Sequence, residues 1–341
     1  MTHLSLLKFQ STPKYIPSHV FQPLVNANAK EVVYEVASPE EICAAQQNFE
    51  NDFIQQHTLV LNVKGDMQGR IVLAAPQGQF QYAVKLLGNG HILQCDAMIE
   101  QSEMVKVVGL LSLQIQDLSI DGKGIAGCGI RIEENRQLKL CNVKISNTGA
   151  QGLSVLPSHE VESHVSLVDV EFSGLGRRKK DLKSLHAVYV NHHNSSVIRI
   201  LDSVVQFERV LIQNSSAKTA IHIANENTQK FALSGLQILN SAFVVGMILV
   251  GSGENRIDGL EVIRNRFGDP DQSTNVIIYF GNDAVQNEIT TLKIFNPLYR
   301  DLTGLEQVYS CGNEEAVISV FDSTAQQGEA HLTVQYQEFV G

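Results

Sequence analysis

The stretch Leu118-Ser-Ile-Asp-Gly122 recurs with variations along the middle of the chain. Each copy has apolar, variable, apolar and variable residues, followed by a glycine or an asparagine. The other copies are Val143-Lys-Ile-Ser-Asn147, Val170-Glu-Phe-Ser-Gly174, Val210-Leu-Ile-Gln-Asn214, Leu236-Gln-Ile-Leu-Asn240 and Leu292-Lys-Ile-Phe-Asn296. Two of the steps are 27 residues (147 to 174) and 26 residues (214 to 240). A short unit that recurs at such a period is typical of a solenoid.

A second short apolar run follows most of these copies. These runs are Gly129-Ile-Arg-Ile132, Gly152-Leu-Ser-Val155, Ala187-Val-Tyr-Val190, Ala220-Ile-His-Ile223, Gly246-Met-Ile-Leu249 and Asn275-Val-Ile-Ile278. Apolar residues alternate with others in both kinds of run, which predicts strands with one buried face. No helical pattern of roughly 10–15 residues separates the runs, which excludes a βαβ fold. We therefore expect a coil in which each strand pairs with its equivalent in the next turn.

The pattern apolar-x-apolar-x-Asn, followed by Gly-apolar-x-apolar, resembles the right-handed parallel β-helix, or pectin-lyase-like, superfamily over roughly residues 59–320. The resemblance implies an all-β fold, a single-stranded right-handed parallel β-helix solenoid. It implies no single activity, because that superfamily contains lyases, hydrolases, epimerases, phage tailspikes and binding proteins. An internal ladder of buried amides is predicted for Asn147, Asn214, Asn240 and Asn296, with simple turn asparagines as the alternative.

A helix is predicted near the N-terminus, over residues 38–53. Ser38 has the position of an N-cap, a proline follows it, and Glu41 stands three residues beyond the cap. An apolar stripe follows at steps of three or four residues, formed by Ile42, Ala45, Phe49 and Phe53. Such a helix would cover the open end of the solenoid. The chain then divides without a linker into an arm with a capping helix (1–58), the β-helix (59–325) and a closing strand (326–341).

The composition narrows the classes of function and compartment. A net charge of −10 argues against a general partner for nucleic acids or anionic membranes. The N-terminus has neither the positive region nor the apolar core of a signal peptide, and no run approaches a membrane span. The five cysteines are scattered, which predicts neither a disulfide framework nor a metal cluster. We expect no cofactor, and a location in the cytoplasm or in a phage particle assembled there.

Candidate site residues come from the second runs, where the residues between inward positions must face outward. Down the coil, one outward row reads Arg131, Ser154, Tyr189, His222, Ile248 and Ile277, and the next reads Glu133, Leu156, Asn191, Ala224, Val250 and Tyr279. Rungs of such a coil are about 4.8 Å apart, which brings Arg131, Tyr189 and His222 within about three rungs. His186 lies beside them, and an inserted basic loop enters directly before it, with Arg177, Arg178 and Lys180.

These side chains suit an enzyme that cleaves an acidic, uronate-containing polysaccharide by β-elimination. Arg131, or a lysine of the inserted loop, can neutralise the uronate carboxylate, so that the C5 proton becomes acidic. His222 can take that proton, and Tyr189 can protonate the leaving oxygen. The predicted substrate-binding residues are His186, Asn191, Glu133, Arg177, Arg178 and Lys180.

Other functions fit the same pattern. A C5 uronate epimerase needs the same base with a second proton donor on the opposite face of the sugar. A non-catalytic glycan-binding or structural β-helix, such as a phage tailspike-like module, is favoured by the absence of Trp and by the apolar Ile248–Ile277 end of the row, through which a homo-oligomer could form. The outward rows contain no Asp, which excludes hydrolases of the polygalacturonase kind and calcium-dependent lyases. His192 and His193 lack further ligands at metal-binding spacing, so no metal is predicted.

Overall fold

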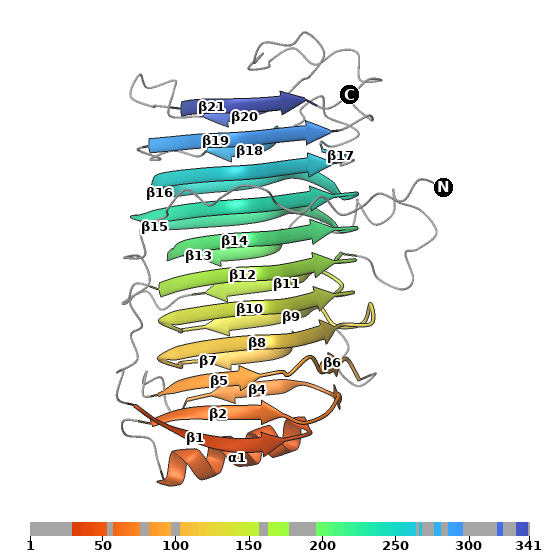
Figure 1. The fold of residues 1–341 in the computed structure, drawn as a ribbon, viewed down its shortest axis with the longest axis vertical. Helices are drawn as coiled ribbons and strands as arrows, with labels where there is room; N and C mark the ends of the chain where they lie inside the picture. Colours follow the sequence, from red (N-terminus) through yellow and green to blue (C-terminus); the bar gives the residue numbers. More distant parts are fainter. Residues whose placement is uncertain are drawn as a thin grey trace.

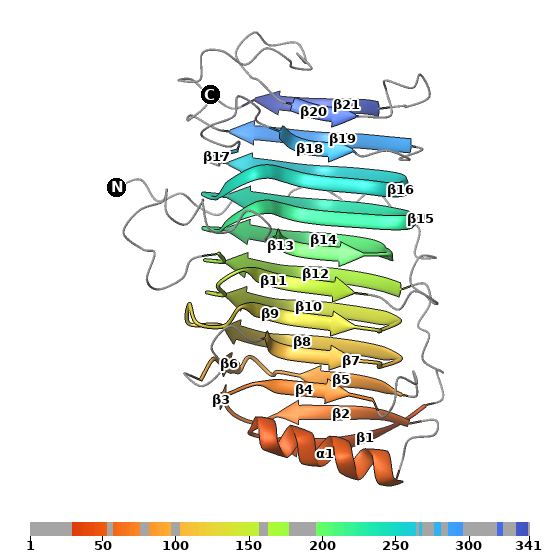
Figure 2. The same cartoon turned by 180° about the vertical axis from the view of Figure 1, so that it is seen from behind.

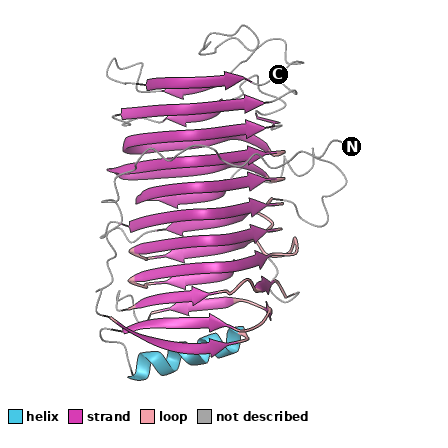
Figure 3. Ribbon diagram, viewed as in Figure 1, coloured by secondary structure: helices cyan, strands magenta, loops and turns pink. Residues whose placement is uncertain are grey.

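The computed structural model describes residues 29–52, 57–75, 82–96, 103–156, 163–176, 196–263, 266–267, 276–280, 286–295, 319–322 and 332–339. Within these residues the chain forms a parallel β-solenoid, in which each strand pairs in parallel with strands one turn away. Figure 3 shows that strands make up almost all of this fold and that the helix lies at one end. The predicted fold class, an all-β parallel β-helix with a helix at its N-terminal end, is confirmed.

The longer strands lie one above another in a single parallel stack (Figure 1). In order along the coil axis they are β1 (Lys30–Val36), β2 (His57–Val63), β5 (Ala83–Leu87), β8 (Ser112–Asp121), β10 (Gln137–Ser146), β12 (Ser163–Ser173), β14 (Ser203–Gln213), β15 (Ser216–Leu239), β16 (Ala242–Ile263), β19 (Gln286–Phe295) and β21 (Leu332–Phe339). The predicted closing strand, β21, therefore pairs with β19 as a further rung of this stack.

A second stack of shorter strands lies behind the first in the view of Figure 1 and runs in the opposite direction. Figure 2 shows it from its own side. It contains β4 (Ile71–Ala74), β7 (Glu103–Val108), β9 (Cys128–Glu133), β11 (Gln151–Leu156), β13 (Ser196–Leu201), the first halves of β15 and β16, β18 (Val276–Phe280) and β20 (Ser319–Asp322). Three short strands pair at the corners, namely β3 (Met67–Gln68), β6 (Ile92–Gln94) and β17 (Arg266–Phe267). Climbing from β1 to β21, the coil is right-handed (Figures 1 and 2).

The core is a continuous column of inward-facing apolar side chains. The predicted inward positions of the second runs are buried wherever the structure describes their side chains, at Ile130, Ile132, Leu153, Val155, Ile221, Ile223, Met247 and Leu249. Val188 and Val190 lie outside the described residues. Because every turn places the same kind of residue at the same register position, the stack buries one unbroken apolar core.

The predicted internal ladder of asparagines is wrong for the residues that the structure describes. Asn147, Asn214 and Asn240 are exposed, and each has a left-handed backbone, with φ of 54°, 49° and 48°. Gly174 holds the same register position as Asn147 and has φ of 66°. Glycine and asparagine tolerate this conformation better than other residues, which explains why they alternate at the corner. Asn296 lies outside the described residues.

The internal polar ladder is formed instead by the residue after the asparagine. Ser215 and Ser241 are buried directly behind Asn214 and Asn240. The Ser215 hydroxyl donates to the carbonyl oxygen of Gln213 at 2.9 Å and accepts from the N–H of Leu175, on the previous turn, at 3.2 Å. The N–H of Ser215 donates to the Ser241 hydroxyl, on the next turn, at 3.1 Å. Small hydroxyls therefore bind the corner backbone of successive turns.

The capping helix α1 (Pro39–Asp52) begins as the sequence predicts. The Ser38 hydroxyl accepts a hydrogen bond from the N–H of Glu41 at 3.2 Å, and the Glu41 carboxylate accepts one from the N–H of Ala37 at 2.6 Å. These two bonds satisfy N–H groups that the helix itself leaves free. Figure 2 shows α1 lying across the first turns of the coil.

The apolar face of α1 is buried against the solenoid. Ile42, Ala45 and Phe49 are buried, and the rings of Phe49 and Tyr82 lie with centroids 5.1 Å apart. The amide of Gln46, also buried, donates to the Tyr82 hydroxyl at 2.8 Å. The helix therefore covers the apolar end of the core, as predicted. Phe53, the last residue of the predicted stripe, lies outside the described residues.

The serine ladder predicts a difference between two neighbouring substitutions. Ser215→Ala leaves the buried N–H of Leu175 without an acceptor, which we expect to lower the free energy of unfolding by about 1–3 kcal/mol. Asn214→Gly keeps the left-handed backbone and removes only an exposed side chain, so the expected change is within about 0.5 kcal/mol. Urea unfolding followed by circular dichroism measures both. A greater loss of stability for Asn214→Gly than for Ser215→Ala would contradict the serine ladder and support an asparagine ladder instead.

Candidate functional site

One outward row of the second stack carries the candidate site. Strand register places these residues on successive rungs: Val72, Lys106, Arg131, Ser154, Arg199, His222, Ile248, Tyr279 and Phe321. Adjacent rungs are about 4.8 Å apart. From β7 to β15 the row carries three basic side chains and a histidine, with Ser154 between the two arginines. The row thus places positively charged groups in a line along the coil axis.

The structure corrects the predicted composition of this row. Arg199 of β13 pairs with both Ser154 and His222, so it holds the rung that was predicted for Tyr189. In the neighbouring row, Leu201 holds the position predicted for Asn191, because it pairs with Ala224. Two runs alternate equally well in this turn, residues 187–190 and residues 197–201. The prediction chose the first run, whereas the second forms the strand.

A second correction applies further along the same row, beyond His222. Tyr279 pairs with Ile248, where Ile277 was predicted, because β18 pairs with β16 two residues further along than the predicted alignment has it. Several predicted site residues lie outside the described residues, namely Tyr189, His186, Asn191, Arg177, Arg178 and Lys180. Their predicted roles stay predictions.

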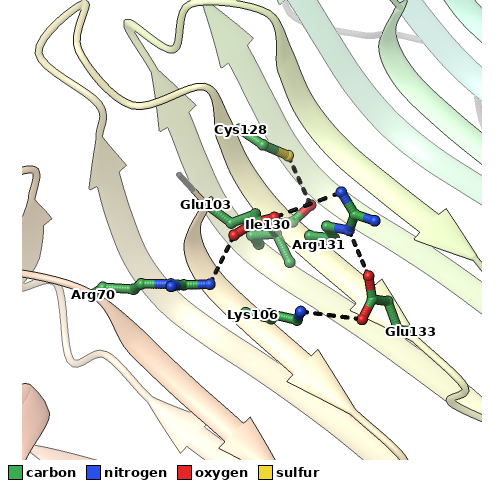
Figure 4. A network of polar contacts seen from close by, with 7 residues as sticks. All are labelled: Arg70, Glu103, Lys106, Cys128, Ile130, Arg131 and Glu133. Carbon is green, nitrogen blue, oxygen red and sulfur yellow. Dashed lines mark hydrogen bonds and ion pairs between the residues drawn. The ribbon is translucent and has the colours of Figure 1, made fainter. Parts of the chain in front are cut away.

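Arg131 and Glu133, two predicted site residues, belong to one network of ion pairs (Figure 4). The Arg131 Nε donates to Glu133 Oε1 at 2.7 Å, and its Nη1 lies 3.6 Å from Glu103 Oε1. Arg70 donates to Glu103 Oε2 at 2.7 Å, and the Lys106 Nζ lies 3.3 Å from Glu133 Oε2. Each cation therefore faces a carboxylate of the chain itself.

This network lowers the availability of Arg131 for a ligand. Burial acts to raise the pKa of Glu133, but hydrogen bonds from Arg131 and Lys106, together with their charges, hold it below its ordinary value. The carboxylate is thus ionised at neutral pH and competes with any bound anion. The side chains of Arg131 and Glu133 are 39% and 24% exposed, so an ion pair here is reachable by solvent and solutes.

The upper end of the row, at β13 and β15, differs, because the described residues place no carboxylate in an ion pair with its basic groups. Arg199 and His222 are neighbours on adjacent rungs, and Lys218 precedes His222 on β15. Among the residues that the structure describes, neither Arg199 nor Lys218 forms an ion pair. His222 is half-buried, and burial lowers its pKa, with further contributions from the charges of Arg199 and Lys218. His222 is therefore uncharged at neutral pH and can accept a proton.

The structure offers no second type of site in its described part. No group of three or more His, Cys, Asp or Glu side chains there could hold a metal ion. Burial raises the pKa of the Cys128 thiol to about 12, so it is not a nucleophile at neutral pH. No helix among these residues is long and apolar enough to cross a membrane.

Comparison of the chain with models of known protein families, with curated proteins and with solved structures finds no significant match. The structure supports the parallel β-solenoid, and membership of the pectin-lyase-like superfamily stays a prediction.

Arg199 and Lys218 are the candidate residues that the sequence prediction missed. A signal for Arg199 was present: the tripeptides Ile130-Arg-Ile132, Ile198-Arg-Ile200 and Ile221-His-Ile223 each place a basic residue between two inward isoleucines. The structure puts all three tripeptides in one row. Lys218 had no comparable signal. Its proximity to His222 on an exposed part of β15 depends on where that strand begins, and the sequence alone does not show this.

The charges around His222 predict how its titration responds to substitution. A nearby positive charge disfavours the protonated imidazole, so removing one should raise the pKa of His222. We expect wild-type His222 to titrate below its ordinary value of about 6.5, and Arg199→Gln or Lys218→Gln to move the midpoint upward. Nuclear magnetic resonance of the histidine ring protons against pH measures this, with the His222→Gln spectrum giving the assignment.

Lys144→Gln is the control for this titration, because Lys144 pairs with Glu171 on the first stack. It should leave the His222 midpoint unchanged. A midpoint at or above about 6.5 in the wild type, or no response to either substitution beside His222, would contradict the electrostatics described here.

Proposed function

We propose that this chain binds a linear, uronate-containing polysaccharide on the outward row of the second stack and cleaves it by β-elimination at Arg199 and His222. The observation that carries the proposal is that Arg199, which forms no ion pair with any residue that the structure describes, stands one rung from the neutral imidazole of His222. Elsewhere on the row, Arg131 is already engaged by carboxylates of the chain. The upper end is therefore the better place for a ligand carboxylate.

Each residue has a role that its chemistry supports. Arg199 pairs with the uronate carboxylate and stabilises the negative charge that develops on it, in the role first predicted for Arg131. His222, neutral at working pH, takes the C5 proton. The electron pair of that C–H bond forms the C4–C5 double bond, and the C4–O bond breaks. The leaving oxygen takes a proton from an acid, the role predicted for Tyr189, which lies outside the described residues.

A second candidate is a non-catalytic polyanion-binding module. The observation that favours it is the network of Arg70, Glu103, Lys106, Arg131 and Glu133, whose three cations face two carboxylates and which contains no histidine or tyrosine to transfer a proton. A C5 epimerase would share the first step, with the proton returned from the opposite face of the sugar.

The near-ultraviolet absorbance of the unsaturated uronate tests the proposal directly. The protein is incubated with a panel of acidic polysaccharides that includes galacturonate, mannuronate, guluronate and glucuronate polymers. We expect a rise with one class, and a loss of at least about 100-fold in the initial rate for His222→Ala, in keeping with the contribution of a general base. Arg199→Gln should have a loss of similar size, and Lys144→Gln should match wild type.

Two further readouts separate the alternatives. Proton spectra recorded in deuterated water detect exchange or inversion at C5, and co-sedimentation with insoluble polymer detects binding. Absence of both product and inversion with retained binding would replace the lyase by the binding module. Absence of binding to every polymer would contradict both candidates.

A further inference from the structure

The charges of the second stack are arranged differently along the strands and across them, and this arrangement constrains how a polymer can bind. Along a strand the sign changes: β9 carries Arg131 and Glu133, and β7 carries Glu103 and Lys106. Across the strands the sign is constant, since Lys106, Arg131 and Arg199 occupy one row. A polyanion lying along a strand would meet carboxylates, whereas one lying along the coil axis meets cations.

We propose that the polysaccharide lies along the coil axis, across the strands, and that Lys106 and Arg131 form a second anion subsite for its distal part. The row from β7 to β15 spans four rung steps, about 19 Å in all. The inference rests on the proposed function, because it extends the Arg199 and His222 site to neighbouring units of the same ligand. It names the ligand more closely, as an oligomer long enough to reach past Ser154.

The second subsite is latent, because Glu103 and Glu133 occupy its cations in the free protein. The network holds three cations, Arg70, Lys106 and Arg131, against two carboxylates, so it keeps one net positive charge. A ligand carboxylate can replace Glu133 beside Arg131. Neither Arg131 nor Glu133 is then left as a buried charge, since both side chains are partly exposed. Glu133 then sets how strongly long oligomers bind.

Ser154 gives the two subsites their separation. It is buried and lies one rung from each arginine, so Arg131 and Arg199 stand two rung steps apart, about 10 Å. Ser154 brings no charge to the row. The cations therefore fall into two groups, Lys106 with Arg131 below the serine and Arg199 with Lys218 above it.

A length series of ligands tests this inference. Fluorescence anisotropy of end-labelled oligomers of galacturonate, mannuronate, guluronate and glucuronate, from two to ten units, gives dissociation constants in a His222→Gln background. Glutamine is neutral, as His222 is at neutral pH, and it prevents cleavage during the measurement. We expect affinity to rise with length up to a plateau, and Arg199→Gln to weaken binding at every length.

Substitutions in the lower network should act only on long oligomers. Arg131→Gln is expected to weaken the long ones about fivefold, and Glu133→Gln to strengthen them by a similar factor, while leaving the shortest unchanged. Binding that is independent of length, or an equal effect of Arg131→Gln at every length, would overturn the inference and leave the Arg199 and His222 site intact. Absence of binding at every length would overturn the proposed function together with it.

Discussion

The in-register parallel pairing of successive turns is the constraint on which the rest of this structure depends. Each backbone N–H and C=O of a strand bonds to the turn before or after, so a residue's neighbours are fixed one turn away along the chain. Inward positions become a continuous apolar column, and outward positions become straight rows. The end of such a stack would expose unpaired strand and apolar core. Helix α1 covers that end with Ile42, Ala45 and Phe49.

The same constraint turns a sequence pattern into a functional surface. Arg131, Arg199 and His222 lie 68 and 23 residues apart in sequence, yet they stand within three rung steps of one another because each follows an inward isoleucine. What separates them chemically is their surroundings. Arg131 is shared between Glu103 and Glu133, whereas Arg199 and Lys218 form no ion pair within the described residues and both disfavour the protonated form of His222. Within the described residues, the basic part of the row therefore has one end whose cations are paired with carboxylates and one end whose cations are not.

The sequence predicted the fold well and the site only in part, for physical reasons. Alternation of apolar residues at a fixed period depends only on burial, so the coil, its inward column and the start of α1 followed from it. The turn that contains Tyr189 and Arg199 offered two runs of equal alternation, and only tertiary pairing selects the second. The repeated asparagines predict an internal amide ladder, but Asn214 has a left-handed backbone and an exposed side chain, and Ser215 binds the corner backbone instead. Arg131 is predicted to pair with a uronate carboxylate, but in the structure it pairs with Glu133 on its own strand and lies near Glu103 of the previous turn, a neighbour that depends on the register.

The proposed site depends on the register of β13, which places Arg199 beside His222. Cysteine cross-linking tests this register most directly. Arg199→Cys combined with His222→Cys would place two thiols on adjacent rungs, with a Cα spacing of about 4.8 Å that suits a disulfide. Mild oxidation of this variant, with the exposed Cys43 replaced by Ser, should give a peptide joined between positions 199 and 222 in the mass spectrum. The matched variant with Tyr189→Cys and His222→Cys should not. A cross-link from position 189 and none from position 199 would contradict the row of cations and the function inferred from it.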